Sequence, residues 1–315
     1  MDAKLMIADI NKPVSKFALG TSFYNVATKE QWFDVLDGYT ESGGTIIDTA
    51  RGYSTSEAVI GLWLDNRSVR DKVVIVTKCG LTSECVLPAD DFDGVINREL
   101  AESLKTLRTD YIDLYMLHRD NQYMPVWEIL EPLNKQISDG KVHAIAASNW
   151  EYRRVSEANE YAYKHGMKGF AAVSNNLSLA APAAAFYTGL VAVDKMGEAW
   201  HRKTGIPLLS WASLARGFFS GQYTPRMRNE PVDGFTSRMI KVYCTDENFE
   251  RLARTKELGE KKGRTAVEVA LSWLLNKPFN MVPIVGLHTR DDLASCLRAF
   301  FAMTEWESKW LNLEV

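Results

Sequence analysis

The sequence predicts an α/β protein that forms a closed (β/α)8 barrel, the TIM-barrel architecture. Eight short β-branched runs recur along the 315 residues, each followed by a longer segment of helical period, a pattern typical of βα units on a parallel sheet. Barrels often run past about 250 residues as one unit, and neither a composition break nor a Gly/Ser linker divides this chain. We therefore expect residues 1–315 to form a single domain. An open, doubly wound sheet stays possible.

The expected strands are nearly continuous apolar runs, which indicates burial on both faces of the sheet. They cover residues 16–19, 45–48, 73–78, 111–118, 142–147, 169–174, 206–211 and 281–285. Helical candidates cover residues 29–39, 93–107, 126–138, 150–163, 248–262, 265–276 and 290–299. The longest irregular segment runs from about 217 to about 234, and such a loop after a barrel strand is usually functional or mobile.

Composition and charge exclude several classes of protein. With 46% apolar and 24% charged residues, the chain can fill a large core, which excludes disorder, collagen and coiled coil. The formal net charge is −3 without a cluster of Lys and Arg, so we expect no nucleic-acid partner. Four cysteines without a CxxC pair indicate reduced thiols. No run of about 18 apolar residues occurs, so we expect a soluble, cytoplasmic protein without a membrane partner.

Several common cofactor and catalytic signatures are missing from the sequence. No GxGxxG follows the first expected strand, which argues against the open dinucleotide-binding fold. The five histidines have no HxH or HxxxH spacing, so we expect no metal site. A GxSxG nucleophile elbow is also absent.

Four titratable side chains follow the ends of three successive strands, where barrel enzymes hold their reactive groups. Asp48 ends the second run and Tyr53 lies in the loop beyond it. Lys78 ends the third run and His118 ends the fourth. Each alone is more often structural, but together they form a proton-transfer unit: the Lys favours the phenolate, the Asp keeps the Lys charged, and the His orients the substrate oxygen. Such a unit suits hydride transfer at a carbon that carries that oxygen.

The chain resembles the aldo-keto reductase superfamily from about residue 17 to about residue 297. The motifs that carry the resemblance are LGTS at 19–22, DTARGY at 48–53, SEAVIG at 56–61, VTK at 76–78, DLYMLHRD at 113–120 and the SN pair at 148–149. The resemblance implies a barrel with a nicotinamide cofactor extended across its C-terminal face. It also implies that Asp48, Tyr53, Lys78 and His118 are the catalytic tetrad, with Tyr53 as general acid.

The same resemblance assigns cofactor contacts residue by residue. Ser148 and Asn149 match the pair that hydrogen-bonds the nicotinamide carboxamide, and Trp211 matches the ring stacked on the nicotinamide. Ser174 stands where the family usually has Gln, so we expect one amide contact to be replaced or lost. SLARG at 213–217 matches the loop that follows the pyrophosphate. The full expected set is Thr21, Asp48, Ser148, Asn149, Ser174, Trp211, Ser213, Leu214, Arg216, Gly217, Gly286, His288, Arg290 and Asp292.

The choice between NADP(H) and NAD(H) stays open at the adenosine end. The family pattern that prefers NADPH has basic residues at the positions of His288 and Asp292, and an Asn at that of Cys296. Here Asp291 and Asp292 are acidic, although Arg290 could reach the 2′-phosphate. A carboxylate would repel that phosphate but could accept hydrogen bonds from a free ribose hydroxyl.

Rings and polar groups just beyond the strand ends could line a substrate pocket. These are Phe23, Tyr24, Arg119, Asp120, Asn121, Tyr123 and Trp150. Such a mixture would suit a hydroxylated, sugar-like substrate.

We therefore expect an NAD(P)(H)-dependent oxidoreductase that moves a hydride between the nicotinamide and a carbonyl or alcohol carbon of an aldehyde, ketone or sugar-like small molecule. The alternative is a nicotinamide-binding redox sensor or regulatory subunit that acts through a protein partner, against which the intact tetrad argues. A hydrolytic barrel built on Asp48 would need a second carboxylate at a strand end, and none is obvious. The sequence does not identify an oligomeric partner.

Overall fold

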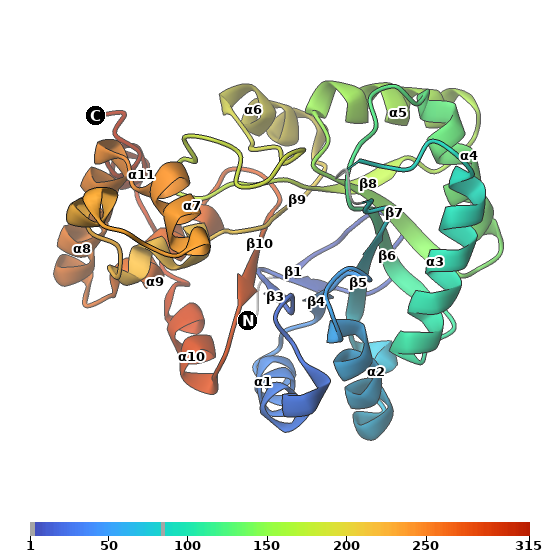
Figure 1. Ribbon diagram of the computed structural model, residues 1–315, viewed down its shortest axis with the longest axis horizontal. Coiled ribbons are helices and arrows are strands. Elements are labelled where there is room, and N and C mark those ends of the chain that lie inside the picture. Colours follow the sequence, from blue (N-terminus) through green and yellow to red (C-terminus); the bar gives the residue numbers. More distant parts are fainter. Residues whose placement is uncertain (1–3, 83–85) are drawn as a thin grey trace.

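The computed structural model describes residues 4–82 and 86–315, and it confirms the (β/α)8 barrel (Figure 1). Eight parallel strands follow one another in chain order, and the barrel closes because the last strand pairs with the first. The strands are β3 (Ala18–Gly20), β4 (Ile46–Asp48), β5 (Val74–Cys79), β6 (Ile112–Leu117), β7 (Val142–Ser148), β8 (Phe170–Ser174), β9 (Leu208–Ser210) and β10 (Met281–Gly286). Each strand lies within two residues of the bounds predicted from the sequence.

Helices follow the strands and surround the barrel. The first six strands lead into α1 (Lys29–Glu41), α2 (Ser56–Arg67), α3 (Phe92–Leu107), α4 (Val126–Ser138), α5 (Tyr152–Lys164) and α6 (Lys195–Thr204). The segment after β9 holds the short 3-10 helices η3 (Ala215–Ser220) and η4 (Pro225–Asn229), then α7 (Gly234–Tyr243), α8 (Asp246–Lys262) and α9 (Ala266–Leu275). After β10 come α10 (Arg290–Arg298) and α11 (Glu305–Leu311). In Figure 1, α7, α8, α9 and α11 gather on the left, opposite α3 to α5.

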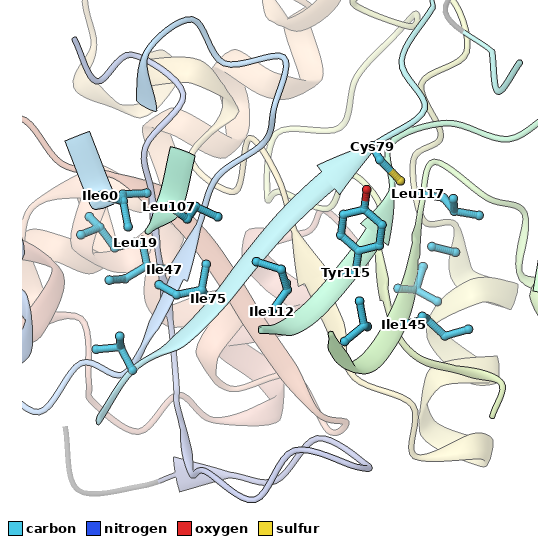
Figure 2. Packing of buried hydrophobic residues seen from close by; sticks show 14 of the residues in the cluster. Leu19, Ile47, Ile60, Ile75, Cys79, Leu107, Ile112, Tyr115, Leu117 and Ile145 are labelled. Atoms are coloured by element: carbon cyan, nitrogen blue, oxygen red, sulfur yellow. The ribbon is translucent and has the colours of Figure 1, made fainter. Parts of the chain in front are cut away.

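Side-chain alternation along the strands separates the barrel interior from an outer apolar layer. In β6, Leu114 and Met116 belong to the interior cluster, whereas Tyr115 and Leu117 belong to the cluster that packs against the helices. Figure 2 shows this outer layer, in which consecutive strands contribute Leu19, Ile47, Ile75, Tyr115 and Ile145. The same alternation decides which side chains at the strand ends face the interior.

An N-terminal hairpin closes one end of the barrel. Its strands, β1 (Lys4–Leu5) and β2 (Val14–Ser15), pair antiparallel. Ile7 and Ile10 pack into the interior cluster, beside residues from the beginnings of the barrel strands. This arrangement covers the N-terminal end of the barrel, so the opposite end is the one available for ligands. Within the described ranges, no helix is long and apolar enough to cross a membrane.

Candidate active site

A cavity of about 800 Å³ opens at the C-terminal ends of the strands. Its volume lies within the range typical of small-molecule and cofactor sites. Asp48, Tyr53, Lys78 and His118 all line it, so the structure brings together the four titratable residues singled out in the sequence.

The alternation of side chains along the strands points three of the four residues into this cavity. Each of the three lies two positions after an apolar residue of the barrel interior: Ile46 before Asp48, Val76 before Lys78 and Met116 before His118. Because side chains two positions apart on a strand share a face, the polar groups continue the interior layer at the open end of the barrel. Tyr53 comes instead from the loop between β4 and α2, where its backbone N–H donates to the carbonyl of Ala50 at 2.9 Å.

Lys78 is the centre of the polar cluster. Its Nζ lies 2.6 Å from Asp48 Oδ1, donates to the carbonyl oxygen of Thr49 at 2.8 Å, and lies 3.5 Å from Tyr53 Oη. Both members of the ion pair are buried. Burial alone would lower the pKa of Lys78, but the charge of Asp48 and the neighbouring Tyr53 raise it above its ordinary value. Lys78 is therefore an ammonium that points at the Tyr53 hydroxyl.

His118 completes the cluster as a neutral imidazole. Burial lowers its pKa well below the ordinary value, and the cations Lys78 and Arg119 lower it further. Its ring meets that of Tyr53 nearly edge-on, with centroids 5.7 Å apart. A neutral imidazole here can exchange a hydrogen bond with a ligand oxygen without adding a charge.

Most of the residues expected to hold a cofactor line the same cavity. They are Thr21, Asp48, Ser148, Asn149, Trp211, Ser213, Leu214, Arg216, Gly217, Gly286 and His288. Ser174, Arg290 and Asp292 do not belong to the lining. Ser174 is fully buried, and its hydroxyl has no hydrogen-bond partner within the part of the chain that the structure describes.

Ser148 and Asn149 are already fixed by contacts within the protein. The Ser148 hydroxyl donates to the carbonyl of Ser174 at 2.9 Å. Asn149 donates from Nδ2 to the carbonyl of His118 at 3.2 Å, and its Oδ1 accepts from the N–H of Val191 at 3.2 Å. The Asn149 backbone takes a left-handed conformation with φ of 61°. This pair therefore connects three strand ends as well as lining the cavity.

The backbone after β9 has an unusual conformation that suits close approach of a ligand. Ala212, Ala215, Arg216 and Gly217 all have positive φ, which is uncommon for residues other than Gly. Ser213 fastens this loop to β10, because its hydroxyl donates to the carbonyl of Ile284 at 2.6 Å. Strained backbone of this kind clusters at ligand sites.

Two further features indicate that the cavity can accept an extended ligand. Trp211 lines it, and the buried Nε1 of this ring has no hydrogen-bond partner among the described residues. A Cβ at Gly286 would lie 2.7 Å from the ring of Phe23, so any larger residue here would have to displace that ring. Phe23 also stacks on His288 at 4.1 Å and 14°. The polar side chains of the lining and the close approach of backbone and ring at Gly286 fit a nicotinamide dinucleotide that lies across the strand ends.

Arg290 and Asp292, which were expected to contact the nucleotide, instead contact other residues of the protein. Arg290 forms ion pairs with Asp34 at 2.7 Å and Glu41 at 2.8 Å, which holds it against α1. Asp292 accepts from the backbone N–H groups of His288 and Thr289 at 2.9 and 3.1 Å, as the reciprocal member of a capping box on α10. In this structure the two side chains therefore cap and anchor a helix rather than face the cavity.

The expected substrate-lining set needs correction. Phe23 and Arg119 line the cavity, but Tyr24 and Trp150 do not, since they are 1% and 0% exposed and belong to the outer apolar layer. Tyr24 stacks on Trp32 at 4.5 Å, and the Trp150 indole donates to the carbonyl of Arg119 at 3.1 Å.

The polar loop residues beyond β6 are also absent from the lining. Asp120 pairs with Arg154 at 2.9 Å, Asn121 donates to the carbonyl of Leu87, and Tyr123 is 99% exposed. Position after a strand does not by itself tell whether a side chain points toward the cavity or into the layer behind it.

Sequence reasoning missed several apolar residues of the cavity, including Leu81, Tyr187 and Phe235. Leu81 lies two residues after the end of β5, so its place after a strand was an available signal. Tyr187 lies between β8 and α6, and Phe235 lies in α7, so only the folded chain brings them to the cavity. Arg216 stacks on the neighbouring Phe186 ring at 4.4 Å and helps to hold this segment at the rim.

The described residues contain no group of three or more His, Cys, Asp or Glu side chains that could hold a metal ion.

Comparison with known proteins identifies a family whose model matches nearly the whole chain. The model of the aldo/keto reductase family matches residues 16–310. Norsolorinic acid reductase stcV of Emericella nidulans is 30% identical over 89% of this chain and 72% of its own length. The uncharacterized oxidoreductase YrpG of Bacillus subtilis is 30% identical over 91% of this chain and 87% of its own. The glycerol dehydrogenase AKR11B4 from Gluconobacter oxydans has the same fold, with a TM-score of 0.79 and 22% identity over 99% of this chain and 94% of its own. This chain belongs to the aldo/keto reductase family.

Proposed function

We propose that the protein reduces the carbonyl group of a small aldehyde or ketone with a nicotinamide dinucleotide, and that Tyr53 is the proton donor. Membership of the family and the relatives named as reductases and oxidoreductases support an NAD(P)-dependent oxidoreductase. The observation that carries the proposal is the contact between the Lys78 ammonium and the Tyr53 hydroxyl, at 3.5 Å, inside an 800 Å³ cavity.

In this proposal Tyr53, Lys78 and Asp48 have separate roles in one proton transfer. A bound nicotinamide dinucleotide, NADP(H) or NAD(H), supplies or accepts the hydride. In the direction of reduction, the Tyr53 hydroxyl gives its proton to the carbonyl oxygen as the hydride reaches the carbon, and the Lys78 ammonium stabilises the phenolate left behind. Asp48 Oδ1, 2.6 Å from Lys78 Nζ, keeps Lys78 charged and directed toward Tyr53. In oxidation the phenolate takes the proton back from the alcohol.

His118 is proposed to position the substrate oxygen. It lies beside the Tyr53 ring and is neutral, because burial and two nearby cations lower its pKa. A neutral His can donate one hydrogen bond to the carbonyl oxygen from the same side as the phenol. With Tyr53 it would hold that oxygen at two points, which orients the carbon for hydride transfer.

The rim of the cavity favours a substrate with an apolar, aromatic portion. Leu81, Tyr187 and Phe235 line the cavity yet are 39%, 44% and 48% exposed, so a ligand that covers them would remove apolar surface from water. A relative named norsolorinic acid reductase and others named as probable or putative aryl-alcohol dehydrogenases are consistent with this preference. Tyr24 and Trp150 lie behind the cavity, so two of the rings expected beside a sugar-like substrate do not face it.

The proposal is tested by titrating the purified protein with NADPH and with NADH by calorimetry, and then by following oxidation of the bound nucleotide on addition of an aromatic aldehyde or an aldose. We expect binding of at least one nucleotide and faster turnover of the aromatic aldehyde. Tyr187→Ala should raise KM for the aromatic aldehyde and leave KM for a short aliphatic aldehyde unchanged.

Two results would contradict the proposal. If neither nucleotide bound, the tetrad would have no hydride source. If nucleotide bound tightly but no carbonyl compound was reduced, the alternative of a redox sensor that acts through a protein partner would take its place.

A further inference from the structure

Two consecutive residues at the beginning of α2, Ser56 and Glu57, hold together three neighbouring strand ends. The Ser56 hydroxyl lies 2.7 Å from the hydroxyl of Thr21 and 2.8 Å from that of Thr49. Glu57 Oε1 accepts a hydrogen bond of 2.6 Å from the Thr77 hydroxyl. All five side chains are buried. We call these five residues the hydroxyl clamp.

Each threonine of the clamp stands directly beside a residue that faces the cavity. Thr49 follows Asp48, and its carbonyl oxygen is one of the acceptors of the Lys78 ammonium, at 2.8 Å. Thr77 precedes Lys78 in β5, so the two side chains point to opposite faces of the strand. Thr21 follows the strand end at Gly20, and its hydroxyl reaches the carbonyl of Asp48 at 2.8 Å.

The clamp is also connected to Tyr53 through the chain itself. The backbone N–H of Ser56 donates to the carbonyl of Tyr53 at 2.9 Å, so the first residue of α2 fixes the turn that carries the phenol. One short segment therefore contacts the turn that carries Tyr53, and its side chains contact the strand ends that carry Asp48 and Lys78. Lys78 Nζ and Tyr53 Oη, 3.5 Å apart, belong to these two contacted parts.

Glu57 places an ionisable carboxyl group in a buried position, where an apolar side chain could fill the same space. Burial raises the pKa of its carboxyl group, while the hydrogen bond from Thr77 lowers it in part. A buried carboxylate costs free energy that an apolar side chain of the same size would not, and the hydrogen bond from Thr77 offsets part of that cost. The hydroxyl of Thr77 is a directional partner, which fixes position as well as charge.

We propose that Ser56 and Glu57 are positioning residues for proton transfer, which act by setting the distance and direction between Lys78 and Tyr53 through the hydroxyl clamp. This inference rests on the proposed function, because it assigns the clamp to the proton-transfer step of that reaction. It predicts that weakening the clamp at Thr77 or Ser56 slows the chemical step and leaves ligand binding intact, since neither of these two residues lines the cavity.

The test compares Thr77→Val with Thr77→Ser in the full-length protein. Valine keeps the volume of threonine but cannot donate to Glu57, whereas serine keeps the hydroxyl. We expect Thr77→Val to lower kcat about tenfold or more, because small misplacements of reacting groups reduce rates by that order. KM and the dissociation constant for nucleotide should stay within about twofold. This change is smaller than the tenfold loss of kcat, which corresponds to about 1.4 kcal/mol. Thr77→Ser should restore kcat.

The matched control is Thr255→Val. Thr255 is as buried as Thr77 and its hydroxyl donates to the carbonyl of Leu252 at 2.7 Å, but it lies in α8 and does not line the cavity. Rates are divided by the number of nucleotide-binding sites found by titration, so that a smaller folded fraction does not imitate a slower step. Thr255→Val should then keep the kcat of the unmodified protein.

Ser56→Ala provides an independent variant if Thr77→Val does not fold. It removes the hydroxyl between Thr21 and Thr49 and should likewise lower kcat with little change in KM. The inference would be overturned if folded Thr77→Val or Ser56→Ala kept its kcat, or if each lost nucleotide affinity as much as rate. Failure of the proposed function would be recognised separately, because the unmodified protein itself would then reduce no carbonyl compound.

Discussion

Replacing Lys78 by Met should destabilise the protein in a way that depends on pH. Lys78 and Asp48 form an ion pair of 2.6 Å with side chains only 3% and 5% exposed, and the ammonium also donates to the carbonyl of Thr49. Met has a similar length but no charge, so the Asp48 carboxylate would stay buried without its cation. Breaking a buried pair by removing one partner costs about 3–5 kcal/mol. We expect a loss of this size at neutral pH.

The sign of the pH dependence follows from Asp48. Burial already raises the pKa of this carboxyl group, and Lys78 opposes that effect, so removal of Lys78 raises the folded-state pKa further. A carboxyl group whose folded pKa lies above its unfolded value favours the folded state at low pH, and this stability is lost as the pH rises through the folded pKa. Lys78→Met should therefore lose more stability at about pH 8 than at about pH 5.

The assay is urea unfolding followed by tryptophan fluorescence at both pH values, for the unmodified protein, Lys78→Met and the double variant Asp48→Asn with Lys78→Met. The double variant has no buried charge at the pair, so it should recover part of the lost stability and show a smaller pH dependence than Lys78→Met. An equal loss for Lys78→Met at both pH values would refute the reasoning that an uncompensated Asp48 carboxylate is the cause.

Three further outcomes follow from the structure. Gly286→Ala should weaken nucleotide binding in a titration, because the new methyl group would displace the phenyl ring beside it, whereas Gly234→Ala, with open space around it, should not. Lys12→Met removes one of two cations from the fully buried Asp113; because Arg70 still pairs with that carboxylate, the loss should be about 1–3 kcal/mol in urea unfolding while kcat stays unchanged. Since the pKa of His118 is lowered well below its ordinary value, this imidazole stays neutral at and above its ordinary pKa, and a pH profile of kcat should have no inflection from it near about pH 6.5.

The barrel strands could be predicted because their signal is local. Each is a short, buried β-branched run, and parallel strands buried on both faces give a continuous apolar pattern. Alternation along the strand also predicts which side chains at the strand ends face the barrel interior. The interior positions of β5 lead to Lys78 and those of β6 lead to His118, so side-chain direction at these two positions was also encoded in the sequence.

The surroundings of the tetrad were harder to predict because they depend on packing beyond the strand ends. Tyr24 and Trp150 follow strands just as the cavity residues do, but they turn into the outer layer, where apolar neighbours bury them completely. Asp292 was expected at a nucleotide, yet it lies in the first turn of α10, where a carboxylate that accepts two backbone N–H groups is a strong local alternative. Tyr187 reaches the cavity from a long connection without any periodic pattern.

The most direct test of the central claim is the single-turnover rate of hydride transfer in Tyr53→Phe, measured with saturating reduced nucleotide and an aldehyde that the unmodified protein reduces. Removal of the hydroxyl near Lys78 should lower this rate by about 10²–10⁴-fold, the size typical of general acid catalysis, while the dissociation constant for nucleotide changes by no more than a few fold. A Tyr53→Phe protein that binds nucleotide and keeps the rate of the unmodified protein would contradict the account, because the proton would then come from another group.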